Sequence, residues 1–397
     1  MYKADFPIFQ SQKEPFVFLD TAASAQKPAV VIDAISEMYK TAYANVHRGL
    51  YHLADKASEA FENARQTIAQ FIGAQSQDII WTRGATEAIN LVAHTFGQTL
   101  QAGDEVVISI AEHHSNLVPW QVLRDQKGIV LKCIPVSKRG LPDMQAYQNA
   151  LTEKTKLVAM AHMSNVLGTV FPVDEVVQQA HKVGAKVLLD GTQSVVHLPI
   201  DVKRIGCDFF VFSGHKLYGP TGIGVLYAPQ ALMNTLPPFQ TGGQMVKTVT
   251  LEQTSYEESP ARFEAGTPPI VEAVGLAAAV RYLQSLGLDN VKKHEERISA
   301  LLMQSLAELP FIEPLGDLSE KKGLVSFNVK GVHAYDVGTF LSMSGIAVRV
   351  GLHCAEPLAR VFNVPASVRV SLGLYNTEED IQALLVGLNK IKKVHGL

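Results

Sequence analysis

The chain has 397 residues, of which 47% are hydrophobic and 18% charged, and 35 Lys and Arg against 38 Asp and Glu give a formal net charge of −3. This composition excludes a mainly disordered chain, because disorder goes with low hydrophobicity and high net charge. Like charges do not cluster along the chain, so we expect neither nucleic acid nor an acidic membrane as a partner. The charged fraction is below the roughly 25% of typical soluble domains, which favours an extensive subunit interface.

The apolar runs are short, whereas a bilayer span needs about 20 consecutive apolar residues, so no membrane helix is expected. Asp5 and Pro7 stand where a secretory signal would be apolar, which predicts a cytoplasmic protein. Three cysteines, far apart and without Cys-x-x-Cys spacing, indicate neither a disulfide framework nor a metal site. Cys133 and Cys207 lie in or beside apolar strands and are interpreted as core residues, which leaves Cys354 as the candidate for chemistry.

Between about residues 55 and 230, helical periodicity alternates with short β-rich runs, a pattern typical of parallel strands joined by crossover helices. Phe61, Ala64 and Ile68 share one face of a predicted amphipathic helix that ends at Gly73. Most of the predicted strands are apolar throughout, as expected for strands covered on both faces. These strands are 79–82, 106–110, 130–134, 157–161, 187–189, 209–212 and 225–227.

The second half of the chain has a different organisation. The segment 236–269 is rich in Pro and Gly and is predicted to be an extended, functional loop. A helix follows over 271–286, and mixed helices and strands come after it, with one strand at 324–329. We therefore predict an N-terminal arm over 1–20 that packs with the smaller domain, a large domain over 21–287 and a smaller α+β domain over 288–397.

The most informative stretch is an apolar strand that runs into the turn Ser213-Gly214-His215-Lys216. Ligands of open α/β sheets bind beyond the carboxyl ends of the strands, so Lys216 is expected to face a crevice. Asp190 ends another apolar strand, where an unpaired charge would be costly. Ala85 and Thr86 follow a strand and a glycine, where a helix N-terminus suits a phosphate. A lysine, an acid and a phosphate site are the protein parts that pyridoxal phosphate requires.

Five separated motifs together resemble those of pyridoxal-phosphate-dependent cysteine desulfurases, and more closely the SUF-type, group II branch, which includes selenocysteine lyase activity. The resemblance runs from about Phe18 to the C-terminus. It implies an α/β fold of the fold-type I transferases, with a mainly parallel seven-stranded sheet in the large domain and a smaller α+β domain. The motifs are 112–116, 190–193, 213–216, 262–268 and 349–355.

The resemblance also implies how pyridoxal 5′-phosphate is held. Lys216 carries the cofactor covalently and moves the substrate α-proton, which suits a lysine shielded from water. Asp190 pairs with the pyridinium nitrogen, Gln193 and Asn165 bind the phenolic oxygen, and His113 stacks on the ring and exchanges a proton with the substrate thiol. The implied phosphate ligands are Thr86, Ser213, His215, the amides of Ala85 and Thr86, and Thr267 of a neighbouring subunit.

On the substrate side, Arg369 matches an arginine that binds the substrate carboxylate, a task that suits a planar, bidentate donor. Cys354 is predicted to receive sulfur, since an accessible thiolate is nucleophilic. Arg349, which flanks the Cys354 loop, and Asn165 are included among the substrate-binding residues. His47, which matches a histidine near the active-site entrance, is included as well. One position departs from the branch motif, because Leu352 stands where a histidine is usual.

The predicted function is a homodimeric enzyme that converts L-cysteine to L-alanine and leaves a persulfide on Cys354. A sulfur-acceptor protein of the SUF/CSD type would then receive the sulfur for iron–sulfur cluster assembly or related delivery. The alternatives within the family are selenocysteine lyase, with L-selenocysteine as substrate, and a class V aminotransferase or epimerase. A catalytically silent sulfur carrier or scaffold is the alternative from another class, and the intact Lys216, Asp190 and Cys354 argue against it.

Overall fold

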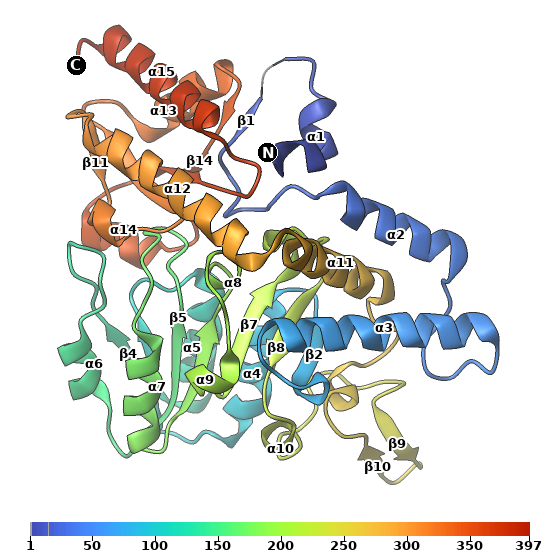
Figure 1. Ribbon diagram of the computed structural model, residues 1–397. Helices are drawn as coiled ribbons and strands as arrows, with labels where there is room; N and C mark the ends of the chain where they lie inside the picture. The colour runs from blue at the N-terminus through green and yellow to red at the C-terminus, as the bar shows by residue number, and fades with distance from the viewer. Residues whose placement is uncertain (1, 15) are drawn as a thin grey trace.

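The computed structural model describes residues 2–14 and 16–397, and a seven-stranded sheet forms its centre (Figure 1). The strand order is β2-β8-β7-β6-β5-β3-β4. β8 pairs antiparallel with β2 and β7, and the other neighbours pair in parallel, which confirms the predicted mainly parallel sheet. The strands are β2 (Ile79–Thr82), β3 (Glu105–Ser109), β4 (Val130–Ile134), β5 (Thr155–Ala161), β6 (Lys186–Asp190), β7 (Phe209–Ser213) and β8 (Gly224–Tyr227).

Alternating residues of the central strands enter two different hydrophobic cores, one on each face of the sheet. In β7, Phe210 and Phe212 join the core that includes α3 (His52–Phe71), α7 (Val173–Lys182) and α11 (Ile270–Leu286). Phe209 and Val211 join the opposite core, with α4 (Ala85–Thr99) and α5 (Val118–Lys127). Because successive side chains of a strand point to opposite faces, this double cover explains why the predicted strands are apolar throughout.

A second sheet has the order β11-β12-β15-β14, and all its neighbours pair antiparallel. Its core is shared with three helices, drawn orange to red at the top of Figure 1. The N-terminal strand β1 (Val17–Phe18) pairs in parallel with β13 (Ile346–Ala347), which sets the arm beside this sheet. The division of the chain at residues 20 and 287 stays a prediction. These elements are β11 (Ile312–Pro314), β12 (Leu324–Val329), β14 (Arg349–Gly351), β15 (Ser367–Ser371), α12 (Leu288–Ala307), α13 (Ala334–Met343) and α15 (Glu378–His395).

Two expectations from the sequence need correction. The segment 236–269 contains a hairpin of β9 (Val246–Val249) and β10 (Thr254–Tyr256), built from β-branched residues between the glycines and prolines. Cys133 is exposed, because β4 is an edge strand, so its interpretation as a core residue is wrong, whereas Cys207 is buried.

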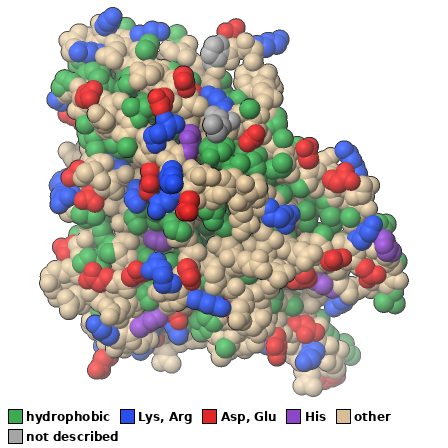
Figure 2. Space-filling view, in the orientation of Figure 1, with side chains coloured by type: hydrophobic (Ala, Val, Ile, Leu, Met, Phe, Trp, Pro, Cys, Tyr) green, Lys and Arg blue, Asp and Glu red, His purple; other side chains and the backbone are tan. Residues whose placement is uncertain are grey.

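The remaining helices are short apart from one, and the surface is mixed in charge. Lys and Arg are interspersed with Asp and Glu on the face that Figure 2 shows. Among the described residues, no helix is long and apolar enough to cross a membrane, and no cluster of three or more His, Cys, Asp or Glu is arranged to hold a metal. The helices not yet named are α1 (Pro7–Gln10), α2 (Ala29–Thr41), α6 (Met144–Ala150), α8 (Ser194–His197), α9 (Val202–Ile205), α10 (Gln230–Met233) and α14 (Glu356–Phe362).

Candidate active site

A cavity of about 300 Å³ lies where the carboxyl ends of β5, β6 and β7 face the second sheet. This is the position at which open α/β sheets bind ligands. The cavity brings together most of the residues that the sequence singled out. The predicted residues that line it are Ala85, Thr86, His113, Asn165, Asp190, Gln193, Ser213, His215, Lys216, Arg349, Cys354 and Arg369.

Lys216 ends a short 3₁₀ turn that follows β7 directly. The N-terminal segment fixes this turn, because the carbonyl of His215 accepts hydrogen bonds from the Ala25 amide at 3.0 Å and from Lys27 Nζ at 3.1 Å. Burial, assisted by the positive charge of Arg369, lowers the pKa of Lys216 to about 8. A larger share of the amine is therefore neutral and nucleophilic than for a solvated lysine.

Asp190 presents a buried carboxylate at the end of β6. Its Oδ1 accepts a hydrogen bond from the Thr192 amide at 2.9 Å, which orients the group. Gly191 makes this turn possible, since a Cβ at that position would lie 1.9 Å from the Phe210 ring. The carboxylate thus has a fixed orientation beside the cavity that Lys216 also lines.

The N-terminus of α4 forms one end of the cavity. The Ala85 amide donates to Ser213 Oγ at 2.9 Å, and Thr86 Oγ1 lies 2.7 Å from Ser115 Oγ. Burial lowers the pKa of His215, which also lines this cavity, to about 4, so its ring is neutral at neutral pH. Amides at a helix start together with hydroxyl groups are typical phosphate ligands.

His113 lies on the cavity wall with a defined tautomer. Its Nδ1 accepts a hydrogen bond from the Ser115 amide at 3.1 Å, so the proton of the neutral ring is on Nε2. Burial lowers the pKa of His113 to about 4, and the nearby positive charges of Lys216 and Arg369 act in the same direction. The ring is therefore uncharged at neutral pH and can stack on a flat ligand.

Arg369 comes from β15 of the second sheet and is almost fully buried. Its Nη1 donates to the main-chain carbonyl of Asn165 at 2.9 Å, while its buried Nε has no hydrogen-bond partner within residues 2–14 and 16–397. The Asn165 side chain in turn donates to the carbonyl of His353 at 2.7 Å. Asn165 therefore ties the arginine to the loop that carries Cys354.

Cys354 is exposed on the loop between β14 and α14. Both His353 (φ 52°) and Cys354 (φ 57°) have left-handed backbone conformations, which are uncommon for residues other than glycine. His353 Nε2 lies within hydrogen-bond distance of Ser367 Oγ, at 3.0 Å. Burial lowers the pKa of the His353 ring to about 3, so the ring is neutral at neutral pH. Such conformations concentrate at functional sites, where the surroundings enforce them.

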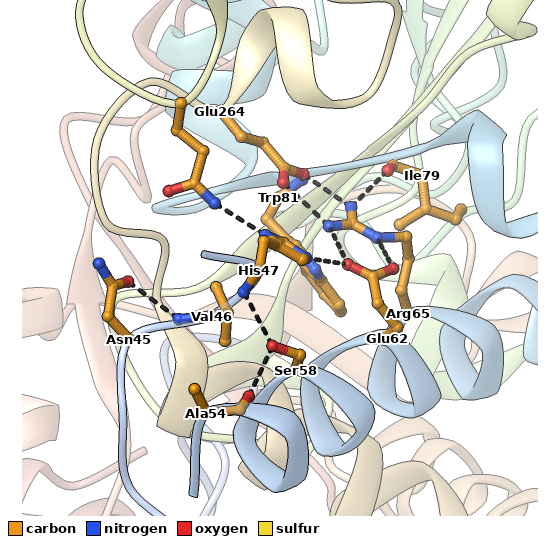
Figure 3. A network of polar contacts seen from close by, with 11 residues as sticks. Asn45, Val46, His47, Ala54, Ser58, Glu62, Arg65, Ile79, Trp81 and Glu264 are labelled. Atoms are coloured by element: carbon orange, nitrogen blue, oxygen red, sulfur yellow. Dashed lines mark hydrogen bonds and ion pairs between the residues drawn. The ribbon is translucent and has the colours of Figure 1, made fainter. Parts of the chain in front are cut away.

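The structure does not bring His47 and Thr267 to this cavity. Figure 3 shows His47 in a separate polar network, with Nε2 3.0 Å from Glu62 Oε1. In the same network Glu264, three residues before Thr267, accepts a hydrogen bond from Arg65 at 2.7 Å. Thr267 itself is exposed beside another cavity. Neither residue lines the Lys216 cavity of its own chain.

Sequence reasoning missed three residues that shape the site. Ser115 contacts both His113 and Thr86 through its hydroxyl group. His113 is the N-cap of the 3₁₀ turn that contains Ser115 and accepts a hydrogen bond from the Ser115 amide. Thr192 has a buried hydroxyl with no partner in the described part of the chain. Asp20 contacts Arg349 and Arg369. No local sequence pattern indicates these contacts, because Asp20 is far from both arginines in the sequence.

The donor set fits a phosphorylated pyridine aldehyde. Lys216 supplies an amine of lowered pKa, Asp190 a carboxylate for a ring nitrogen, and the start of α4 an anion site. The hydroxyl of Thr192 and the Nε of Arg369 are buried donors without a partner in the described part of the chain, and both residues line the cavity. These features favour a cavity built for a polar, anionic ligand.

Comparison with known proteins gives consistent matches. The model of the aminotransferase class-V family matches residues 17–384. A cysteine desulfurase of Escherichia coli O127:H6 is 46% identical over 399 residues, covering 99% of this chain and 98% of that protein. The crystal structure of the cysteine desulfurase CsdA from Escherichia coli has a TM-score of 0.92 at 36% identity and covers 99% of this chain and 98% of that one. The apo structure of a cysteine desulfurase from Thermococcus onnurineus NA1 has a TM-score of 0.94 at 36% identity, and the match covers 100% of this chain and 98% of that chain.

Proposed function

This chain belongs to the aminotransferase class-V family and, within it, to the cysteine desulfurases, and we propose that it releases sulfur from L-cysteine, forms L-alanine and holds the sulfur as a persulfide on Cys354. Membership in this family makes the protein an enzyme that depends on pyridoxal 5′-phosphate. The observation that carries the proposal is that one cavity joins Lys216, Asp190, Arg369 and Cys354. A silent sulfur carrier would not require this combination.

The residues that would hold the cofactor are those around the cavity. Lys216 would bind it covalently, Asp190 would face its ring nitrogen, and His113 would lie against its ring. The phosphate would occupy the α4 N-terminus, with Thr86, Ser213 and His215 as ligands. When bound, the cofactor supplies an electron sink for the charge that develops at the substrate Cα.

Substrate binding and proton transfer follow from the same side chains. The guanidinium of Arg369 binds the substrate carboxylate, for which its unpartnered Nε is available. The neutral amine of Lys216 accepts the proton from the substrate Cα, a role that its pKa of about 8 favours. His113, with its proton on Nε2, exchanges a proton with the substrate thiol.

Sulfur transfer is a displacement at the substrate sulfur. The Cys354 thiolate attacks this sulfur, an S–S bond forms, and the bond between sulfur and Cβ breaks with its electron pair left on carbon. Protonation of that carbon gives the methyl group of L-alanine. The exposure of Cys354 lets a second protein reach the persulfide afterwards.

The experiment that tests this function uses the purified holoenzyme with L-cysteine. Intact mass should show one added sulfur atom per chain, and peptide mapping should place it on Cys354. Borohydride reduction before digestion should place the pyridoxyl group on Lys216. Persulfide on another cysteine, or a pyridoxyl group on another lysine, would contradict the assignment.

We further propose that the enzyme is a homodimer and that Thr267 acts on the phosphate of the partner subunit's site. The exposure of Thr267 and its anchoring through Glu264 support this role, since the side chain is free to reach another chain. His47 lies in the same network through Glu62 and would belong to the same subunit boundary. Sedimentation should give about twice 43.2 kDa, and a fully active monomer would overturn the proposal.

The sulfur acceptor and the location of the enzyme stay predictions. We expect a dedicated acceptor protein of the SUF/CSD type that feeds iron–sulfur cluster assembly, and a cytoplasmic site of action. Affinity capture with the persulfide form of the enzyme, compared with Cys354→Ser, should enrich such an acceptor. Equal capture by both forms would argue against a partner that recognises the loaded loop.

A further inference from the structure

Four consecutive main-chain carbonyls, those of residues 165–168, accept hydrogen bonds from the second sheet and the residues just before it. The four residues lie in the connection between β5 and α7 and form the 165–168 turn. The donors are Arg369 Nη1 to the Asn165 carbonyl at 2.9 Å, Ser326 Oγ to that of Val166 at 2.7 Å, Lys321 Nζ to that of Leu167 at 2.8 Å and the Lys322 amide to that of Gly168 at 2.9 Å.

The 165–168 turn is built to fit closely against the chain around β12. The Gly168 amide donates to the Ser164 carbonyl at 3.0 Å, which closes the turn, and Thr169 forms an antiparallel bridge with Lys321. Gly168 has a left-handed conformation (φ 70°), and a Cβ on it would lie 2.4 Å from the Leu324 carbonyl oxygen. The two segments therefore meet main chain to main chain, which only glycine permits here.

The first carbonyl of the turn connects it to the candidate active site. The Asn165 carbonyl accepts from the buried guanidinium of Arg369, and Arg369 is the direct Cα partner of Ser326 in the antiparallel register. The Asn165 side chain donates to the carbonyl of His353 at 2.7 Å. A shift of the turn would move both the acceptor that orients Arg369 and the contact that holds the Cys354 loop.

Lys321 is the charged donor of this set that lies outside the Lys216 cavity. Its side chain is buried, and its Nζ donates to the Leu315 carbonyl as well as to that of Leu167. Hydrogen bonds from a charged donor are stronger than neutral ones, and a buried carbonyl that loses its donor is costly. Removal of Nζ would therefore favour a shift of the turn that lets water reach these carbonyls.

We propose that Lys321 is a positioning residue for substrate binding, which holds the 165–168 turn against the second sheet and so fixes the orientation of Arg369 toward the substrate carboxylate. The inference rests on the proposed function for the identity of the substrate, but carboxylate binding can be measured without turnover. Lys321 acts through the turn and Asn165 and does not touch the substrate.

The test compares the holoenzyme with Lys321→Met, which keeps a long unbranched side chain but has no donor. The first readout is the dissociation constant of propionate, an unreactive monocarboxylate, by ligand-observed NMR. The second is alanine release from L-cysteine, with kcat and KM measured separately. Lys330→Met is the matched control, because Lys330 Nζ also donates to a main-chain carbonyl, that of Pro310 at 2.8 Å, but is exposed.

In Lys321→Met we expect the dissociation constant of propionate to rise by about tenfold, as the loss of a charged hydrogen bond at the turn would produce. The KM for L-cysteine should rise with it. Lys321→Arg should stay within about twofold of wild type, because it keeps the charge and the donors. Ser326→Ala changes no charge and should raise the dissociation constant by about threefold, since it removes the donor to the adjacent carbonyl. The control should match wild type.

The possible failures are separable. If Lys321→Met is folded and binds propionate as wild type does, or if Lys321→Arg binds as weakly as Lys321→Met, the inference is overturned. If Lys321→Met does not fold, Ser326→Ala decides, and wild-type affinity in that variant overturns the inference. Wild-type affinity in Ser326→Ala beside a weakened Lys321→Met would reveal an effect of charge alone and would overturn it too.

Failure of the proposed function gives a different result. If wild type releases no alanine from L-cysteine but its affinity for propionate responds to Lys321 and Ser326 as expected, the proposed function is wrong and the positioning role stands. If alanine is released and the affinity does not respond, the proposed function stands and the positioning role is wrong.

Discussion

The main-chain amide of His114 donates a hydrogen bond to the carbonyl of Cys354 at a distance of 2.7 Å. The ring of the same histidine accepts a second hydrogen bond from the Glu356 amide at 3.2 Å. His114 thus holds both sides of the left-handed turn at Cys354. The turn before α5 and the loop before α14 therefore act as one unit, although they are distant in sequence.

His114→Ala should slow the formation of the persulfide on Cys354 by about tenfold, because small displacements of a nucleophile from its attack position are costly. The backbone contact survives in this variant, so the loop should stay folded. Cofactor absorbance should not change. Quenched-flow mass spectrometry measures the rate, with His395→Ala on the exposed end of α15 as control. An unchanged rate would show that the ring of His114 has no positioning role.

The pH dependence of cofactor uptake by the apoprotein should report the pKa of Lys216. Burial and then Arg369 lower this pKa to about 8, so the amine is mostly neutral above pH 8 and mostly charged below it. Uptake should therefore accelerate as the pH rises through about 8 and level off above that value. Stopped-flow absorbance at a series of pH values gives the midpoint.

Arg369→Gln should move that midpoint upward, because it removes a nearby positive charge that disfavours the ammonium form. Arg204→Gln, at an exposed ion pair, should leave the midpoint in place. A midpoint near the ordinary lysine value in the wild-type protein would contradict the assignment of Lys216.

Cys354→Ser should bind the cofactor normally and form no persulfide, since the thiolate acts only on the substrate sulfur. Alanine release from L-cysteine should fall at least about a hundredfold, within the range for loss of a catalytic nucleophile. L-Selenocysteine should stay a substrate, because selenium leaves more readily without a nucleophile. Cys133→Ser is the control, being exposed but outside the cavity. Equal turnover of L-cysteine by Cys354→Ser and wild type would exclude the persulfide mechanism.

Turnover with L-cysteine alone should begin with a burst of one alanine per site and continue slowly, because removal of the persulfide limits the rate. Leu352, half-buried beside the loop, stands where the related motif has a histidine. Rapid-quench measurement gives the amplitude of the burst. Leu352→His should raise the rate of the slow phase relative to wild type. Linear accumulation of alanine from the first turnover would show that another step is limiting.

Arg65→Met should lower the free energy of unfolding by about 3–5 kcal/mol, because it leaves the buried carboxylate of Glu264 without its cation. Arg65 donates to both oxygens of Glu264, at 2.7 and 2.9 Å, and to the Ile79 carbonyl at 2.8 Å (Figure 3). Arg204→Met at an exposed pair should cost about 0–1 kcal/mol. Urea unfolding of the two variants measures the difference, and equal losses would refute a special role for the buried pair.

Local patterns in the sequence are sufficient to predict the strands and the groups at their ends. Asp190 and Lys216 follow runs of apolar residues, and the period and length of such runs specify strands and their terminal turns. Ala85 was recognised as a helix start in the same way. Because the carboxyl ends of parallel strands meet at one edge, local patterns were enough to predict that these groups share a cavity.

Contacts between segments that are distant in the chain follow from the packing of the folded molecule. Arg349 and Arg369 are paired within the second sheet, and Asp20 reaches both of them from the N-terminal part of the chain. The hydrogen bond between His114 and Cys354 depends on how the second sheet packs against the first. His47 likewise lies outside the cavity of its own chain, in the network with Glu62. Periodicity records which face of an element is buried, but it does not record which other segment covers that face.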